Sequence, residues 1–274
     1  MSDQSGQDKE DTLVAGEAMQ QLDDLLPIDD HEEDVKIGGK VERRKGVYIL
    51  PNLFTTAGLF SGFYSILSSM QGHFEVAAIA IFFAMIFDIL DGRIARMIDA
   101  QSKFGAEYDS LSDMVSFGVA PAIAMFSWAL HDLNKVGFMA AFIYVAGAAL
   151  RLARFNTQPP TVDKRYFIGL ASPASAAFLA ALLWVASDYG WVEDQLPLWA
   201  SIAITVCTLL CGLMMVSNLK YPSFKGINFA GRVPFVVILL VIIAFAIIGI
   251  DPPKAILVII TLYNLSFVLA LGKK

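Results

Sequence analysis

The chain has 274 residues, of which 56% are hydrophobic, and its mean hydropathy is +0.60. This composition leaves too little polar surface for a soluble globular domain of that length, so it excludes that class. Apolar runs of about 20 residues recur, each long enough to cross a hydrocarbon core of roughly 30 Å. The sequence therefore predicts an all-α, polytopic membrane bundle.

The net charge of −6 hides a division along the chain. Residues 1–35 carry twelve acidic side chains and one basic one, whereas residues 36–274 carry fourteen acidic and nineteen basic ones. Residues 1–35 cannot bury enough apolar surface to offset their chain entropy, so we expect a disordered acidic tail without the apolar core of a signal peptide. Residues 36–49 turn basic and predict an interfacial segment that faces anionic headgroups.

Eight membrane spans are predicted, at 50–70, 73–97, 107–130, 136–154, 169–187, 197–217, 233–249 and 253–271. Residues 50–217 would form a six-helix core, and residues 218–274 a C-terminal two-helix extension. With the N-terminus in the cytoplasm, seventeen Lys and Arg side chains fall on the cytoplasmic side and only Lys135 and Lys254 on the other. This asymmetry follows the positive-inside rule and predicts a multi-pass protein of the cell inner (cytoplasmic) membrane.

Four carboxylates lie within or at the edge of predicted spans, where a charge costs about 2.5–3.5 kcal/mol on insertion scales. Asp88 and Asp91 fall on one face near the end of the second span, and Asp109 and Asp113 on one face at the start of the third. We expect a short cytoplasmic loop containing Gly105 to join the two spans. The two helices would then be antiparallel neighbours whose polar faces meet.

Four facing carboxylates repel one another unless cations lie between them. Oxygen ligands without His or Cys favour Mg²⁺ or Mn²⁺ over zinc, and Arg96 on the same face as Asp88 could bind a phosphate. Charges at a helix end would explain single acids such as Asp99 or Asp163, but they explain the set of four poorly. The pattern predicts a metal and phosphate site at the cytoplasmic interface.

These residues resemble the signature of the CDP-alcohol phosphatidyltransferases, D-x2-D-G-x2-A-R-x8-G-x3-D-x3-D, and every fixed position is filled between Asp88 and Asp113. The resemblance covers roughly residues 47–217. It implies two metal ions, with Asp88, Asp91 and Asp109 as ligands and Asp113 as both a ligand of the second ion and the general base. It further implies that the CDP group of the lipid substrate lies near Asn52, Gly92, Arg96, Ser102 and Gly105.

Within this family the chain resembles the membrane-embedded bacterial phosphatidylserine synthases, through residues 109–121, 150–156 and 166–175. Relatives that transfer to glycerol phosphate typically have Pro and Lys where this chain has Ser110 and Met114. Family members often have Pro at the position of Ala171, a small departure. The resemblance implies CDP-diacylglycerol and L-serine as substrates and a homodimer among membrane lipids. No nucleic-acid partner is expected.

A serine acceptor carries a carboxylate, for which Arg151 and Arg154 at the cytoplasmic end of the fourth span are candidate partners. Either arginine alone is explained about as well by positive-inside anchoring. Asn156, Ser172 and Ser175 are candidate hydrogen-bonding partners of the amino acid.

Three alternatives stay open. The acceptor could be glycerol phosphate, inositol phosphate or choline. A divalent-cation transporter could use the acids, although transporters usually bind their ion nearer the membrane midplane. A structural scaffold would explain neither set of acids. Direct attack of the acceptor hydroxyl is favoured over a covalent intermediate, because no Ser, Cys or His nucleophile is paired with a base in the signature.

Overall fold

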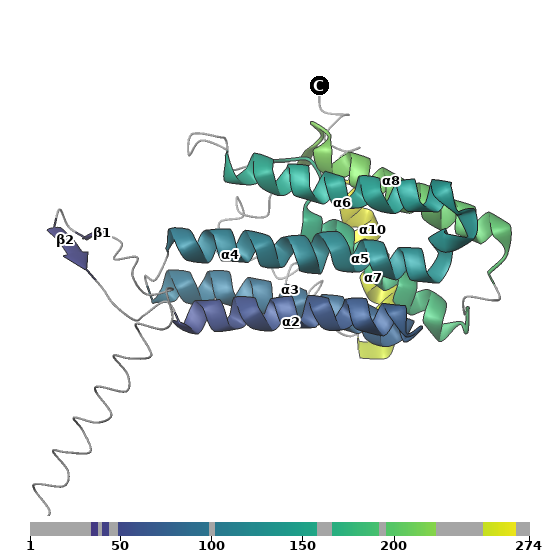
Figure 1. The fold of residues 1–274 in the computed structure, drawn as a ribbon, viewed down its shortest axis with the longest axis horizontal. Helices are drawn as coiled ribbons and strands as arrows, with labels where there is room; N and C mark the ends of the chain where they lie inside the picture. The colour runs from purple at the N-terminus through teal and green to yellow at the C-terminus, as the bar shows by residue number, and fades with distance from the viewer. Residues whose placement is uncertain are drawn as a thin grey trace, which may run out of the picture.

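The computed structural model describes residues 34–37, 40–43, 49–98, 102–157, 166–191, 196–222 and 249–266. Most of these residues belong to long helices that lie side by side (Figure 1). The predicted disorder of residues 1–33 and nearly all of the predicted seventh span, 233–248, lie outside the described residues.

Six helical stretches account for the six predicted spans of the core. They are α2 (Ile49–Met70), α3 (Phe74–Met97), a stretch that begins with α4 (Lys103–Asp113) and continues through α5 (Ala120–Met125), and then α6 (Lys135–Asn156), α7 (Ser172–Asp188) and α8 (Leu198–Val216). Gly72 has a φ of +77° in the turn between α2 and α3, a conformation that glycine adopts without strain. The prediction of an all-α bundle is confirmed.

The third stretch departs from the single regular helix predicted at 107–130. Between α4 and α5 the chain forms a π-helical turn, η1 (Met114–Val119), and after α5 a second one, η2 (Phe126–Leu130), followed by a 3₁₀ turn, η3 (His131–Leu133). Such π-turns are rare and often lie at functional sites. The η1 turn begins at the residue that follows Asp113.

The outer faces of the bundle are apolar. Among the described helices, three are long and apolar enough to cross a membrane: Phe104–Leu133, Lys135–Asn156 and Leu198–Val216, with mean hydropathies of 1.4, 1.8 and 2.1. α3, which carries three acidic and two basic side chains, is not in that group. α2 and α3 nevertheless expose large apolar side chains, including Phe60, Phe63, Phe83 and Ile86. A monomeric soluble protein rarely exposes so much apolar surface, so the bundle is that of a membrane protein.

Two short two-stranded antiparallel sheets accompany the helices. β1 (Asp34–Ile37) pairs with β2 (Lys40–Arg43), so regular structure begins two residues before the predicted end of the disordered tail. β3 (Tyr166–Ile168) pairs with β4 (Lys220–Pro222). The second sheet ties the beginning of the C-terminal extension to the core, an attachment that the sequence did not predict.

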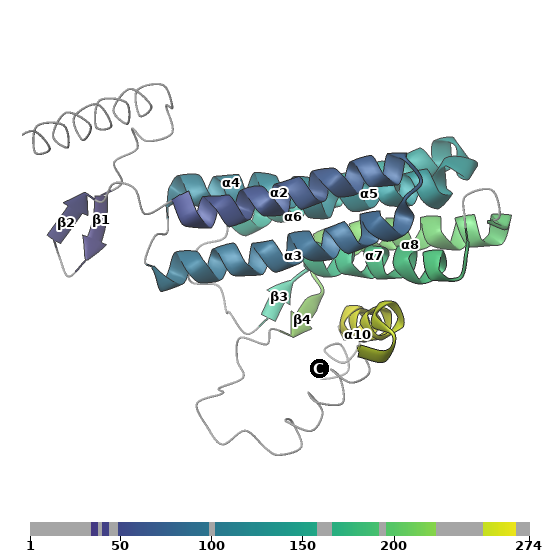
Figure 2. The same ribbon diagram turned by 90° about the horizontal axis from the view of Figure 1, so that it is seen from below.

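The last described helix, α10 (Pro252–Leu265), packs against α7. It runs across the other helices, so Figure 2 shows it nearly end-on. Its 14 residues rise about 21 Å, less than a hydrocarbon core of roughly 30 Å. α10 covers most of the predicted eighth span, 253–271, whose last residues lie outside the described ones, and it is not aligned with the bundle.

Candidate active site

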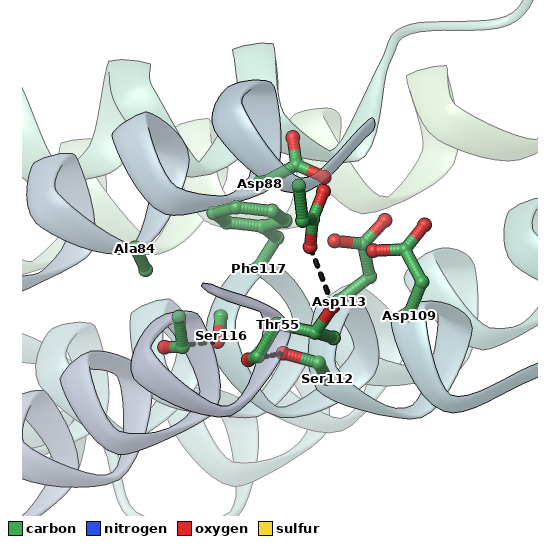
Figure 3. Close-up of a pocket in the computed structure, with 10 residues that line it drawn as sticks. Thr55, Ala84, Asp88, Asp109, Ser112, Asp113, Ser116 and Phe117 are labelled. Carbon is green, nitrogen blue, oxygen red and sulfur yellow. Dashed lines mark hydrogen bonds between the residues drawn. The ribbon is translucent and has the colours of Figure 1, made fainter. Parts of the chain in front are cut away.

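The four predicted carboxylates come together in one pocket, which we call the carboxylate pocket. Asp88 and Asp91 on α3 and Asp109 on α4 offer oxygens that all lie within 4.8 Å of one another. Asp113, at the end of α4, lines the same pocket. Figure 3 shows the side chains of Asp88, Asp109 and Asp113 directed toward a shared space. Asp91 is buried and the other three are partly buried.

Helix α2 closes the pocket from a third side. Thr55 donates a hydrogen bond of 2.8 Å to Asp91 Oδ2, and Ser112 on α4 donates one of 3.2 Å to the backbone oxygen of Thr55. These bonds orient one carboxylate and fix the distance between α2 and α4. Sequence reasoning missed Thr55, although it lies one helical turn after Asn52 and therefore on the same face of α2.

The contact between α2 and η1 depends on glycine. Ser116 on η1 donates a hydrogen bond of 3.2 Å to the backbone oxygen of Gly58. A Cβ at Gly62 would lie 2.4 Å from Ser116 Oγ and 2.7 Å from Ser116 Cα, so only glycine permits this approach, whereas a Cβ at Gly58 would make ordinary contacts at 3.6 Å or more. Small residues four apart allow helices to pack closely in a membrane.

The residues present fit a divalent metal ion. The lining of the pocket includes hydroxyl and carboxylate oxygens but no Lys, Arg or His side chain. Clustered carboxylates of this kind suit hard cations that prefer oxygen ligands.

Three of the predicted nucleotide contacts lie together where α2 and α4 begin. The amide of Gly105 donates a hydrogen bond of 2.8 Å to Ser102 Oγ, which caps α4. A Cβ at Gly105 would lie 3.4 Å from Asn52 Oδ1. Gly105 is in the first turn of α4, so its predicted place in a loop is wrong. The Ser102 cap starts the helix three residues before it.

The other two predicted nucleotide contacts are on α3. Arg96 Nε donates a hydrogen bond of 2.6 Å to the backbone oxygen of Gly92, so the exposed arginine side chain folds back along its own helix. A Cβ at Gly92 would meet only Arg96, at 3.7 Å. Gly92 thus leaves open space one turn from the acids, as the spacing predicted.

The side chains of the two predicted acceptor-binding arginines bond to different parts of the protein. Arg151 Nη1 on α6 donates a hydrogen bond of 2.8 Å to Ser172 Oγ, at the start of α7, and its charge interacts with that of Asp113. Arg154 instead donates to the backbone oxygen of Ser217 at 3.4 Å and to Asn218 Oδ1 at 3.3 Å. The two side chains therefore contact different elements, although the two residues are three apart on one helix.

The remaining predicted acceptor contacts also lie in two different places. Ser175 follows Ser172 by one turn of α7 and is fully buried, and we call Arg151, Ser172 and Ser175 the Arg151 region. Asn156 is exposed and donates a hydrogen bond of 3.0 Å to Ser110 Oγ on α4. Asn156 thus ties α6 to the helix that carries Asp109 and Asp113.

The sequence match to a family model identifies the class of protein to which this helical bundle and carboxylate pocket belong. The model of the family "CDP-alcohol phosphatidyltransferase" matches residues 48–209, more than half of the chain. The chain belongs to the CDP-alcohol phosphatidyltransferase family.

Several known proteins have sequences similar to that of this chain. The chain is 34% identical to "CDP-diacylglycerol--serine O-phosphatidyltransferase" of Helicobacter pylori over 79% of this chain and 88% of that protein. It is 38% identical to the protein of the same name of Mycobacterium tuberculosis, over 56% of this chain and 55% of that protein. It is 34% identical to "Archaetidylserine synthase" of Methanothermobacter thermautotrophicus, over 65% and 72%.

One solved structure is similar to the chain. The apo form of phosphatidylinositol phosphate synthase from Mycobacterium tuberculosis matches 61% of this chain and 83% of that one, with 18% sequence identity and a TM-score of 0.42.

Proposed function

We propose that the protein transfers the phosphatidyl group of CDP-diacylglycerol to the hydroxyl of L-serine and releases CMP. The observation that carries the choice of acceptor is Arg151, a partly buried cation on α6 whose charge interacts with that of the predicted base Asp113. An amino acid bound through its carboxylate to Arg151 would bring its hydroxyl toward Asp113. The relatives from Helicobacter pylori and Mycobacterium tuberculosis carry names that specify serine, which supports the same acceptor.

The carboxylate pocket would bind the pyrophosphate side of the lipid nucleotide. Asp88, Asp91 and Asp109 would hold a divalent metal ion, Mg²⁺ or Mn²⁺, and Asp113 would contribute to a second. Bound there, the metal supplies positive charge to the pyrophosphate and to the CMP leaving group. Thr55 orients Asp91 by the hydrogen bond that it donates, so it supports this site without touching the substrate.

The nucleotide would lie along the cytoplasmic ends of α2, α3 and α4. Asn52, Ser102 and Gly105 form one side of this path, and the open backbone at Gly92 the other. Arg96 can leave its backbone partner at Gly92 and donate to a phosphate, which is a stronger partner for guanidinium than a neutral carbonyl.

The chemical step needs one base. Asp113 accepts the proton of the serine hydroxyl, the hydroxyl oxygen bonds to the phosphorus that carries diacylglycerol, and the bond from that phosphorus to the CMP oxygen breaks. Ser172 holds the guanidinium of Arg151 at 2.8 Å, and Ser175 lies one turn further along α7. We further propose direct attack, a location in the inner membrane with this site on the cytoplasmic side, and a homodimer.

A panel of acceptors tests the proposal. Purified full-length protein is given CDP-diacylglycerol with labelled L-serine, glycerol phosphate, inositol phosphate or choline, and CMP and labelled lipid are measured. We expect labelled lipid and CMP only with L-serine, and neither with the Asp113→Asn variant. Labelled lipid from another alcohol but not from L-serine would leave the family assignment intact and refute the acceptor. Labelled lipid from none, together with metal uptake into vesicles, would favour a transporter.

A further inference from the structure

The π-turn η1 follows Asp113 directly and contributes to the carboxylate pocket. Its residues Ser116 and Phe117 line that pocket together with Asp113 (Figure 3). Phe117 is almost fully buried, with 1% of its surface exposed. Asp113 is the residue from which η1 starts. A change in the course of the backbone through η1 would therefore turn the carboxylate of Asp113 away from its present direction.

A proline gives a physical reason for the π-turn. In a regular α-helix the backbone oxygen of Phe117 would accept a hydrogen bond from the amide of residue 121, but that residue is Pro121, near the start of α5. A proline has no amide hydrogen, and its ring collides with the oxygen four residues earlier in a regular helix. The backbone widens here instead, and the amide of Ala120 donates to the oxygen of Val115, five residues earlier.

Tyr144 on α6 supplies the donor that Pro121 lacks. Its hydroxyl donates a hydrogen bond of 3.1 Å to the backbone oxygen of Phe117. Tyr144 is fully buried, and a backbone oxygen in such surroundings is costly to leave without a donor. On another side of η1, Ser116 donates to the backbone oxygen of Gly58 on α2. Two buried hydrogen bonds, one to α6 and one to α2, therefore hold the π-turn in place.

Tyr144 acts on the pocket only through the backbone. Its side chain is outside the lining of the pocket, whereas Phe117, whose backbone oxygen it binds, is part of that lining. Loss of the hydroxyl would leave the shape of the aromatic ring unchanged and would free one buried carbonyl of η1.

We propose that Tyr144 is a positioning residue for the general base: its hydrogen bond to Phe117 keeps η1 in the π-turn that directs Asp113 into the carboxylate pocket. This inference rests on the proposed function, since it takes Asp113 as the group that accepts the proton of the acceptor hydroxyl. It does not depend on which alcohol is the acceptor, because Asp113 would have the same role for each of them.

The test compares Tyr144→Phe with wild-type full-length protein in steady-state assays that vary L-serine and CDP-diacylglycerol separately. Because the base is misdirected while the binding groups stay in place, kcat should fall about tenfold and both KM values should stay within about twofold. Thermal unfolding in detergent is measured on the same samples, so that the loss of kcat can be compared with any loss of stability.

Ser65→Ala is the matched control. The hydroxyl of Ser65 is also fully buried and also joins two helices, because it donates a hydrogen bond of 2.8 Å from α2 to the backbone oxygen of Ala77 on α3. Ser65 lies outside the lining of the pocket. Its replacement should lower the thermal midpoint as Tyr144→Phe does, while kcat stays within about twofold of the wild-type value.

A double-mutant cycle with Pro121 separates positioning from lost stability. Pro121→Ala restores an amide that can donate to the backbone oxygen of Phe117. Adding Tyr144→Phe to Pro121→Ala should therefore lower kcat by less than about twofold further.

Three results would overturn the inference: an unchanged kcat in Tyr144→Phe, an equal loss of kcat in Tyr144→Phe and Ser65→Ala, or a full tenfold loss on adding Tyr144→Phe to Pro121→Ala. If the wild-type protein uses another alcohol instead of L-serine, the proposed acceptor fails, and the same comparison with that alcohol still tests Tyr144. Wild-type turnover in Asp113→Asn would refute the base and the inference with it.

Discussion

The carboxylate pocket and the Arg151 region differ in how their residues are distributed along the chain. All four acids of the pocket come from two consecutive helices, α3 and α4, joined by a short connection. The elements around Arg151 are α6, which carries it, the next helix, α7, and α10, which packs against α7 and lies far from both in sequence. A compact signature can therefore specify the pocket that we propose binds the shared CDP half of the substrate. The acceptor site that we propose depends on how more distant elements pack.

Removal of divalent metal should have the largest effect on turnover. It should act through the carboxylate pocket and not through the Arg151 region. Excess EDTA should abolish turnover, because four carboxylates cannot bind a pyrophosphate without cations between them. Mg²⁺ or Mn²⁺ should restore turnover and Zn²⁺ should do so poorly, since the ligand set contains only oxygen. CMP release at different free metal concentrations measures this. Full activity in excess EDTA would contradict the proposed metal site.

Asp113 is where the two regions meet, so its replacement probes both. Asp113→Asn should lower kcat by about 10²–10⁴-fold, the usual contribution of a general base. Binding of CDP-diacylglycerol should survive in part, because the oxygens of Asp88, Asp91 and Asp109 still lie within 4.8 Å of one another. Asp163→Asn, outside the signature, is the control. Near-wild-type turnover in Asp113→Asn would rule out this base.

Thr55 tests a part of the pocket that lies outside the signature. Thr55→Val keeps the shape of the side chain but removes the hydrogen bond to Asp91, so we expect kcat/KM to fall about tenfold and to recover in part at higher metal concentration. Thr56→Val is the matched control, because Thr56 donates to the backbone of its own helix at Asn52 and contacts Tyr108 instead of an acid. A larger loss in Thr56→Val than in Thr55→Val would contradict this role.

The smallest effect on chemistry, and a clear effect on stability, is expected at the contact of α2 with η1. Gly62→Ala places a Cβ 2.4 Å from Ser116 Oγ, whereas Gly58→Ala has room. Overpacking of this kind costs about 1–3 kcal/mol. Thermal unfolding in detergent should show a lower midpoint for Gly62→Ala than for Gly58→Ala. Equal midpoints would mean that α2 and η1 are not in close contact.

The difference between the two regions also explains what could be predicted from the sequence. Asp88, Asp91, Asp109 and Asp113 were predicted together because helical periodicity fixes which side chains share a face. Helical periodicity alone did not predict where α4 begins or where its regular hydrogen bonding ends. The Ser102 cap put Gly105 inside α4, and the π-turn η1 began directly after Asp113.

Predictions that needed the packing of distant elements fared less well. Arg151 and Arg154 are three apart and were predicted as a pair, but Arg151 turns toward Ser172 and Arg154 toward Ser217. The packing of α10 against α7 joins segments that lie far apart in sequence. No motif or period relates such segments, so this packing could not be predicted.

The most direct test of the account is the response of the two substrates to loss of Arg151. For purified Arg151→Ala protein, the dissociation constant for CDP-diacylglycerol and the KM for L-serine are measured side by side with those of Arg154→Ala. The account predicts that in Arg151→Ala the KM for L-serine rises by a factor on the order of a hundred, because an ion pair with the acceptor is lost, while CDP-diacylglycerol binding changes by less than about threefold. It predicts a much smaller change in the KM for L-serine in Arg154→Ala. Equal losses for both substrates in Arg151→Ala, or an unchanged KM for L-serine, would contradict it.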